Sequence, residues 1–293
     1  MIRKIQLILI LNLLSFQILA QDSPTSFGER ISFNSEILNE EREIWIYTTE
    51  YYDFSEDSYP VLYLLDAETQ FGHITAMVDY LSAALRIPEL IIVGIPNIDR
   101  VRDFTPIHSF EGLDGKVDST LFMNSGGGDN FLSFLREELI PFVDKNYRTQ
   151  PYRILEGHSL GGMFTTYTLQ KEPELFQASI TISPAFYGKN TQTLSKFSER
   201  IRHLELKSKM FLSIGSEPRL QPGLDSLIYI LSSVSSDSLE WDYRKYLDDD
   251  HASVVHISTH DGLRYIFKDW WIDLNDPSNL PSYKEIQKHF KQL

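Results

Sequence analysis

A short apolar run in this chain passes through a glycine-rich turn directly into a second apolar run, and this arrangement narrows the possible folds. Residues 152–158, "YRILEGH", contain a short apolar run and predict a buried strand. They continue at once into "SLGG" and then "MFTTYTLQKEP", whose spacing predicts a helix that ends at Pro173. A strand, a tight turn and a helix in this order predict one unit of a parallel sheet covered by helices.

The same alternation of apolar runs and helical segments recurs along the chain. We expect an antiparallel strand near an edge at 43–52, buried strands at 59–67 and 89–97, and further strands at 176–184, 209–217 and 240–248. We expect helices at 73–85, 129–147, 161–173, 224–234 and 253–271, with Asp129 or Asn130 capping the second of them. This order predicts an α/β fold of the α/β-hydrolase class, with a mostly parallel central sheet and helices on both faces. Residues 98–127 have no clear periodicity, and so long a loop is usually functional.

The amino-terminal residues have the pattern of a secretory signal peptide. Arg3 and Lys4 precede an apolar run that ends at Ala20, just before polar Gln21. An uncleaved membrane anchor is the alternative. Cleavage after Ala20 predicts a periplasmic or secreted protein with no stable membrane insertion. We expect one hydrolase domain over residues 21–276, followed by a helical tail at 277–293.

Composition narrows the classes of partner and of chemistry. Hydrophobic residues make up 42% of the chain and charged residues 23%, which is typical of a folded protein. The net charge is −14, and loss of Arg3 and Lys4 with the leader makes it −16, so nucleic acid is not an expected partner. The chain has no cysteine, which excludes disulfides, a thiol nucleophile and zinc–thiolate sites. The composition does not indicate an oligomeric state.

The turn after residue 158 has the pattern of a nucleophile elbow. Gly157, Ser159 and Gly161 match G-x-S-x-G, and a predicted strand leads in while a predicted helix leads out. A tight turn of this kind needs small flanking residues, which Gly157 and Gly161 supply, and it exposes the serine hydroxyl at the carboxyl end of the sheet. The backbone N–H of Leu160 would then point at an oxyanion. The alternative is a glycine-rich turn that binds a phosphate or nothing.

A serine nucleophile needs a base and, usually, an acid that follow it in the chain. His251 lies in a loop after the last predicted strand and is our candidate for the base. Glu217 directly follows the strand at 209–217 and is the first candidate for the acid, with Asp225 as the second. His256 and His260 are spaced for one helix face, but they lack the glutamate of a zinc motif, so packing or capping explains them better than a metal site.

The second oxyanion donor is expected in the turn after the strand at 59–67. Our first choice is the backbone N–H of Glu68, with Ala67 next. The Glu68 carboxylate must then turn away from the oxyanion. Acyl transfer through such groups needs no metal and no cofactor.

Several segments together resemble the esterase D-like family of α/β-hydrolases, which includes siderophore esterases such as ferric enterobactin esterase. They are "YPVLYLLDAETQF", "VGIPNIDRVRDFTP", "GGGDNFLSFLREELIPFVDKNYRTQPYRILEGHSLGG", "ITISPAFY" and "HASVVHISTHDGLRYIF", and they extend from Tyr59 to Trp271. The resemblance implies hydrolysis of a small carboxylic ester, with Ser159 as nucleophile and His251 as base. Some members use a Ser–His pair without a conventional acid.

The chain departs from the family pattern at two places. Ala67 stands where relatives often have glycine, and Phe186 and Tyr187 follow a proline where relatives often carry a Trp pair. We expect these two aromatic residues to shape the acyl or aryl pocket. Arg102 lies in the characteristic loop and contacts substrate or, alternatively, holds the loop by a buried ion pair with Asp103. An acyltransferase on the same site and a non-catalytic binding protein remain rival functions.

Overall fold

The computed structural model describes residues 28–112, 115–201, 208–233, 239–271, 281–282 and 284–285. The predicted signal peptide at 1–20 lies outside these residues, and so does the predicted tail at 277–293 apart from its four described residues. Within the described part of the chain, no helix combines the length and the apolar character needed to cross a lipid bilayer.

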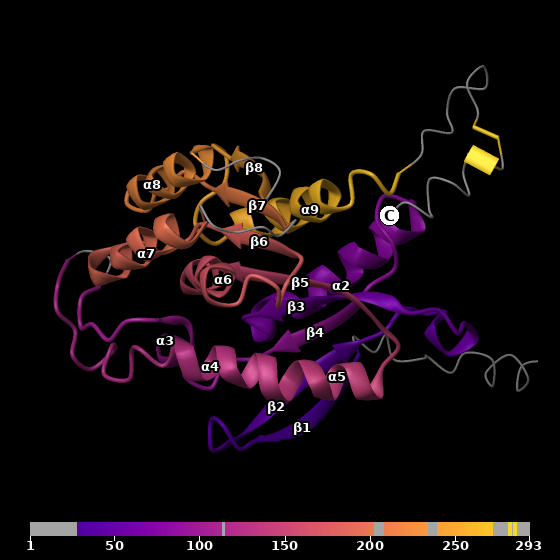
Figure 1. Cartoon of the computed structure of the whole chain (residues 1–293), viewed down its shortest axis with the longest axis horizontal. Helices are drawn as coiled ribbons and strands as arrows, with labels where there is room; N and C mark the ends of the chain where they lie inside the picture. Colours follow the sequence, from indigo (N-terminus) through magenta and orange to yellow (C-terminus); the bar gives the residue numbers. More distant parts are fainter. Residues whose placement is uncertain are drawn as a thin grey trace, which may run out of the picture.

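Eight of the described segments form one sheet in the order β1-β2-β4-β3-β5-β6-β7-β8 (Figure 1). The strands are β1 (Glu29–Ser35), β2 (Glu40–Tyr47), β3 (Tyr59–Leu65), β4 (Ile91–Ile95), β5 (Thr149–His158), β6 (Ala178–Ile182), β7 (Ser208–Ile214) and β8 (Leu239–Lys245). Strand β2 is antiparallel to both β1 and β4, and every pair from β4 to β8 is parallel. The prediction of a mostly parallel sheet with an antiparallel strand near its edge is therefore confirmed.

Helices cover both faces of the sheet (Figure 1). They are α2 (Ala67–Ala83), α3 (Arg100–Phe104), α4 (Gly128–Phe134), α5 (Ile140–Asn146), α6 (Leu160–Lys171), α7 (Gln192–Ile201), α8 (Gln221–Ser232) and α9 (Val254–Ile266). The apolar sides of α2 and α9 pack against one face of the sheet. The other helices bury their main apolar residues in the cluster on the opposite face. Strands β3 and β4 are buried along their whole length, which explains their continuous apolar runs.

Several elements differ from those predicted from the sequence. Strand β1 and helix α7 were not predicted, and α2 starts six residues earlier than the expected helix, at Ala67. The helix expected at 129–147 is α4 and α5 joined by a π-helical turn, Leu135–Leu139. The cap prediction was wrong, because Gly127 rather than Asp129 or Asn130 occupies the N-cap. Short helix α3 lies inside the segment expected to be a loop.

The topology defines where polar side chains can gather. Strands β3, β5, β6 and β7 are consecutive neighbours and run in the same direction, so their carboxyl ends share one edge of the sheet. The predicted elbow follows β5 at this edge, and the predicted acid follows β7. In such sheets, ligands bind outside the carboxyl ends of the strands.

Candidate active site

The turn between β5 and α6 is strained in the way a nucleophile elbow requires. Ser159 has φ 60° and ψ −114°, a backbone conformation that non-glycine residues rarely adopt, and its N–H donates to Ile182 O at 2.9 Å. A Cβ on Gly157 would lie 2.4 Å from the backbone of Gly161, so only glycine fits there. Gly162 is the second such position, because a Cβ on it would lie 2.6 Å from Ile182 O. A Cβ on Gly161 would meet its nearest neighbour only at 3.5 Å, so Gly161 matters less for room than we expected.

The predicted acid and base lie together although they are distant in sequence. Glu217 follows β7, His251 follows β8, and His251 Nδ1 is hydrogen-bonded to Glu217 Oε2. The other carboxylate oxygen, Oε1, accepts hydrogen bonds from Ser183 Oγ at 2.5 Å and from the N–H of Gly215 at 3.0 Å. The Glu217 carboxylate is thus held by side chains or backbone from three neighbouring loops.

The surroundings of Glu217 favour its ionised form. Burial raises the pKa of the carboxyl, but the hydrogen bonds from His251, Ser183 and Gly215 outweigh burial, so the pKa is lowered. A carboxylate on Nδ1 keeps the proton on that nitrogen and leaves Nε2 free to accept one. Asp225, the second candidate acid, lies on α8 and accepts a hydrogen bond from Gln221 Nε2 at 2.7 Å.

The His251 ring packs beside the nucleophile elbow. Its centroid lies 4.3 Å from that of His158, the residue directly before Ser159. Burial and the neighbouring His251 lower the pKa of His158 to about 4, so His158 is neutral at physiological pH. A neutral neighbour does not repel the positive charge that a catalytic base carries after it takes a proton.

The other histidines singled out in the sequence do not form a common site. His256 packs against the His73 ring with centroids 5.5 Å apart, while His260 is hydrogen-bonded to Asp261 at 2.8 Å. Their contacts match the packing interpretation of this pair.

Two helix amino termini supply candidate oxyanion donors. Leu160 is the first residue of α6, and Ala67 and Glu68 are the first two residues of α2. The first N–H groups of a helix have no acceptor within the helix and carry partial positive charge. The Glu68 carboxylate accepts hydrogen bonds from the side chain and the N–H of Asn97, at 2.7 and 3.2 Å. The Glu68 carboxylate is therefore held by a neighbouring loop. A donor role for the Glu68 N–H requires that this carboxylate be turned away from the oxyanion.

The three predicted pocket residues lie in different environments. Phe186 is 3% exposed and belongs to the apolar core cluster, so it is a core residue rather than an exposed pocket residue. Tyr187 is half-buried; burial raises its pKa, and Arg100 partly offsets this increase. Arg102 donates to Glu40 at 2.7 and 2.8 Å and to Asp103 at 2.7 Å, so the ion-pair alternative describes its contacts.

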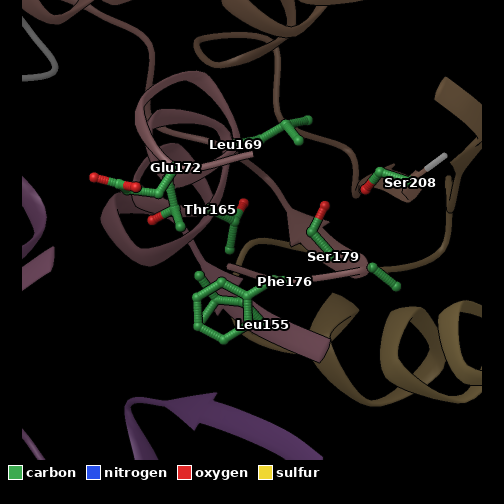
Figure 2. A pocket seen from close by; sticks show the side chains of 9 residues that line it. Leu155, Thr165, Leu169, Glu172, Phe176, Ser179 and Ser208 are labelled. Atoms are coloured by element: carbon green, nitrogen blue, oxygen red, sulfur yellow. The ribbon is translucent and has the colours of Figure 1, made fainter. Parts of the chain in front are cut away.

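Two cavities lie away from this site. One of about 10 Å³, roughly the space of a single water, lies between α6 and strands β5 and β6. Figure 2 shows the side chains that line it, among them Leu155, Thr165 and Ser179. A larger cavity of about 670 Å³ borders Tyr59 and Tyr152 at the amino-terminal ends of β3 and β5. Neither is lined by Ser159, so the side chains rather than cavity size locate the site.

Two polar residues at the site were missed by sequence reasoning. Ser183, which holds Glu217, is fully buried just after β6 and has a positive φ of 44°. Arg100 donates to Asp66 and, at 2.9 Å, to His158 O. The sequence offered only weak signals for them: a polar residue after a buried strand, and an arginine two positions before the one we selected.

The comparisons with known proteins identify the family of the chain. A family model described as "Putative esterase" matches residues 35–252. The chain is 27% identical to ferri-bacillibactin esterase of Bacillus subtilis strain 168 over 229 residues, which cover 71% of this chain and 78% of that protein. It is 26% identical to siderophore enterobactin esterase of Emericella nidulans over 220 residues, which cover 60% of this chain and 71% of that protein.

A solved structure extends the likeness to the fold. The IroE-like serine hydrolase from Shewanella oneidensis matches with a TM-score of 0.82 and 29% identity, over 90% of this chain and 86% of that one. The predicted α/β-hydrolase fold is therefore confirmed. Because the family model covers most of the sequence, the chain belongs to this esterase family.

Proposed function

We propose that this chain is a serine carboxylic ester hydrolase that works through an acyl-enzyme. His251 Nε2 takes the proton of Ser159 Oγ as Oγ attacks the ester carbonyl carbon. The N–H groups of Leu160 and of Glu68 or Ala67 stabilise the oxyanion. Collapse breaks the ester bond, and His251 returns the proton to the leaving alcohol. His251 then removes a proton from water, which attacks the acyl-enzyme, and it returns that proton to Ser159 Oγ as the acid leaves.

The observation that carries this proposal is the contact between Glu217 and His251 beside the elbow. The two residues come from loops after different strands, and the His251 ring packs on the residue next to Ser159. A carboxylate that holds the imidazole in one tautomer also stabilises the imidazolium formed during the reaction. This arrangement favours a catalytic serine over a binding protein that merely kept the fold.

We further propose small siderophore-type or related aryl esters as substrates. The relatives in this family include proteins named for ferri-bacillibactin, enterobactin and siderophore hydrolysis. Half-buried Tyr187, which follows the loop residue Ser183 by four positions, is proposed to offer a surface for an aromatic group.

A panel of esters tests both levels of the proposal. Iron-free and ferric catecholate trilactones, a hydroxycinnamoyl ester, an acetylated sugar and a short-chain nitrophenyl ester are compared at equal concentration, with Ser159→Ala as the control. Hydrolysis by the wild type alone, with kcat/KM highest for the trilactones, is the expected result. Turnover of only the acetylated sugar or of only the activated nitrophenyl ester contradicts the substrate class, and no turnover of any ester contradicts the proposed function. Adding glycerol as a competing alcohol separates hydrolysis from acyl transfer.

We also propose that the protein is exported. The basis is the basic start, apolar run and small residue at position 20 in the sequence. Sequencing the amino terminus of the protein from the periplasm or medium tests this proposal. We expect Gln21 as the first residue, and a chain retained in the membrane with Met1 contradicts it.

A further inference from the structure

One arginine side chain joins the loops that follow three neighbouring strands. Arg100 starts α3, in the connection after β4. Its Nε donates to Asp66 Oδ1 at 2.6 Å and its Nη2 to Asp66 Oδ2 at 2.9 Å, in the turn after β3. The same Nη2 donates to His158 O at 2.9 Å, at the end of β5. Since β3 lies between β4 and β5, the guanidinium spans the edge of the sheet where the site lies.

Both ends of this link are next to the candidate oxyanion donors. Asp66 directly precedes Ala67 and Glu68, and His158 precedes Ser159 and Leu160 by one and two residues. The distance between the two sets of N–H groups therefore depends on the distance between Asp66 and His158.

The Asp66 turn requires such support. Asp66 has φ 55° and ψ 37°, in the left-handed region, and the residue is only 6% exposed. Its carboxylate has one other hydrogen bond among the described residues, from Asn97 Nδ2 at 2.6 Å. Loss of Arg100 would leave a buried carboxylate without its charged partner, and relaxation of the turn would relieve that cost.

We propose that Arg100 is a positioning residue, whose bonds to Asp66 and His158 O hold the two oxyanion donors at the separation the transition state requires. This inference rests on the proposed function. It assigns Arg100 no contact with the substrate. The fork of a guanidinium can serve two carboxylate oxygens and a carbonyl at once, whereas a lysine ammonium is a point charge without that geometry. Arg100 is thus expected to be irreplaceable by lysine.

The test compares Arg100→Ala and Arg100→Lys with the wild type. Arg136→Met is the matched control, because Arg136 also forms ion pairs with carboxylates but lies on the π-helical turn away from the site. kcat and KM are measured with a nitrophenyl ester, and melting temperatures show that each variant is folded. One misplaced oxyanion donor costs roughly a hundredfold in kcat. We expect that loss in both variants, KM within threefold of the wild type, and an unchanged Arg136→Met.

A chemical rescue supplies a readout that a purely structural role would not move. The Arg100 side chain is 33% exposed, so a small solute can reach the space it leaves. Guanidinium ion at tens of millimolar, well below denaturing concentrations, is expected to restore at least tenfold in kcat to Arg100→Ala and nothing to Ser159→Ala. If Arg100→Ala does not fold, Arg100→Lys decides by its kcat alone.

The contrary results are distinct. A wild-type kcat in Arg100→Lys overturns the positioning role. So does a loss of activity in Arg100→Ala that comes from a higher KM and is not accompanied by guanidinium rescue of kcat. A wild type that does not react with a fluorophosphonate contradicts the proposed function instead, and this reaction is run first. If the wild type and the Arg100 variants react equally with the fluorophosphonate, the inference about Arg100 is overturned and the proposed function stands.

Discussion

A buried glutamate beneath the elbow predicts an unusual dependence of stability on pH. Glu156 lies in β5, three residues before Ser159, and is 1% exposed. Burial raises the pKa of its carboxyl from 4.5 to about 8, although a hydrogen bond with Thr259 lowers it somewhat. Thr259 Oγ1 is also 3.0 Å from Val255 O and has only one proton to donate. A protonated Glu156 that donates to Thr259 satisfies both contacts, in agreement with the raised pKa.

The sign of the effect follows from which state binds the proton. Between pH 4.5 and pH 8 the folded protein holds the Glu156 proton and the unfolded chain releases it, so the free energy of unfolding falls as pH rises. The slope is about 1.4 kcal/mol per pH unit, which amounts to about 4 kcal/mol between pH 5 and pH 8. Glu156→Gln has nearly the same shape, can donate to Thr259 and does not titrate.

Urea unfolding of the wild type and of Glu156→Gln at several pH values measures this directly. Taking the difference between the two proteins at each pH removes the contributions of other groups, including His158, whose lowered pKa acts in the opposite direction below pH 6.5. We expect Glu156→Gln to gain about 4 kcal/mol relative to the wild type from pH 5 to pH 8. A difference that stays flat across this range refutes the reasoning.

Three further predictions concern the site. Glu217→Gln is expected to lower kcat by roughly a thousandfold or more, because His251 loses the carboxylate that orients it, while Asp225→Asn keeps wild-type kcat; equal losses would contradict the assignment of the acid. Ser183→Ala removes one hydrogen bond to Glu217 and is expected to lower kcat about tenfold. A wild-type kcat in this variant would show that the bond does not orient the carboxylate. Gly157→Ala is expected to lose about 3 kcal/mol or more in urea unfolding and Gly161→Ala less than about 1; the reverse order would contradict the elbow packing.

The sequence predicted the central strands well and the edge of the sheet poorly. Strands β3 and β4 carry continuous apolar runs because neighbouring strands and helices enclose them. Strand β1 is mostly exposed, and only its last residue is buried, so it has no such run. Strand β1 forms because it pairs with β2, and the residues of β1 alone do not indicate this pairing. Helix α7 was predictable, since its buried Leu194, Phe197 and Ile201 have helical spacing.

The same distinction applies to the site. Ser159, Glu217 and His251 could be selected because local motifs and their order after predicted strands indicate them. Ser183 and Arg100 could not, because their contacts depend on which strands are neighbours in space. Ser183 reaches Glu217 only because β6 lies beside β7. Arg100 reaches the loops after β3 and β5 only because β4, β3 and β5 are consecutive in the sheet.

The central claim is that Glu217 and His251 activate Ser159 as a nucleophile. Intact mass after incubation with a fluorophosphonate tests it most directly, with the wild type beside Ser159→Ala and His251→Ala. The account predicts one covalent adduct on the wild type, none on Ser159→Ala and strongly slowed formation on His251→Ala. A folded wild type that forms no adduct, or an adduct that persists in Ser159→Ala, would contradict it.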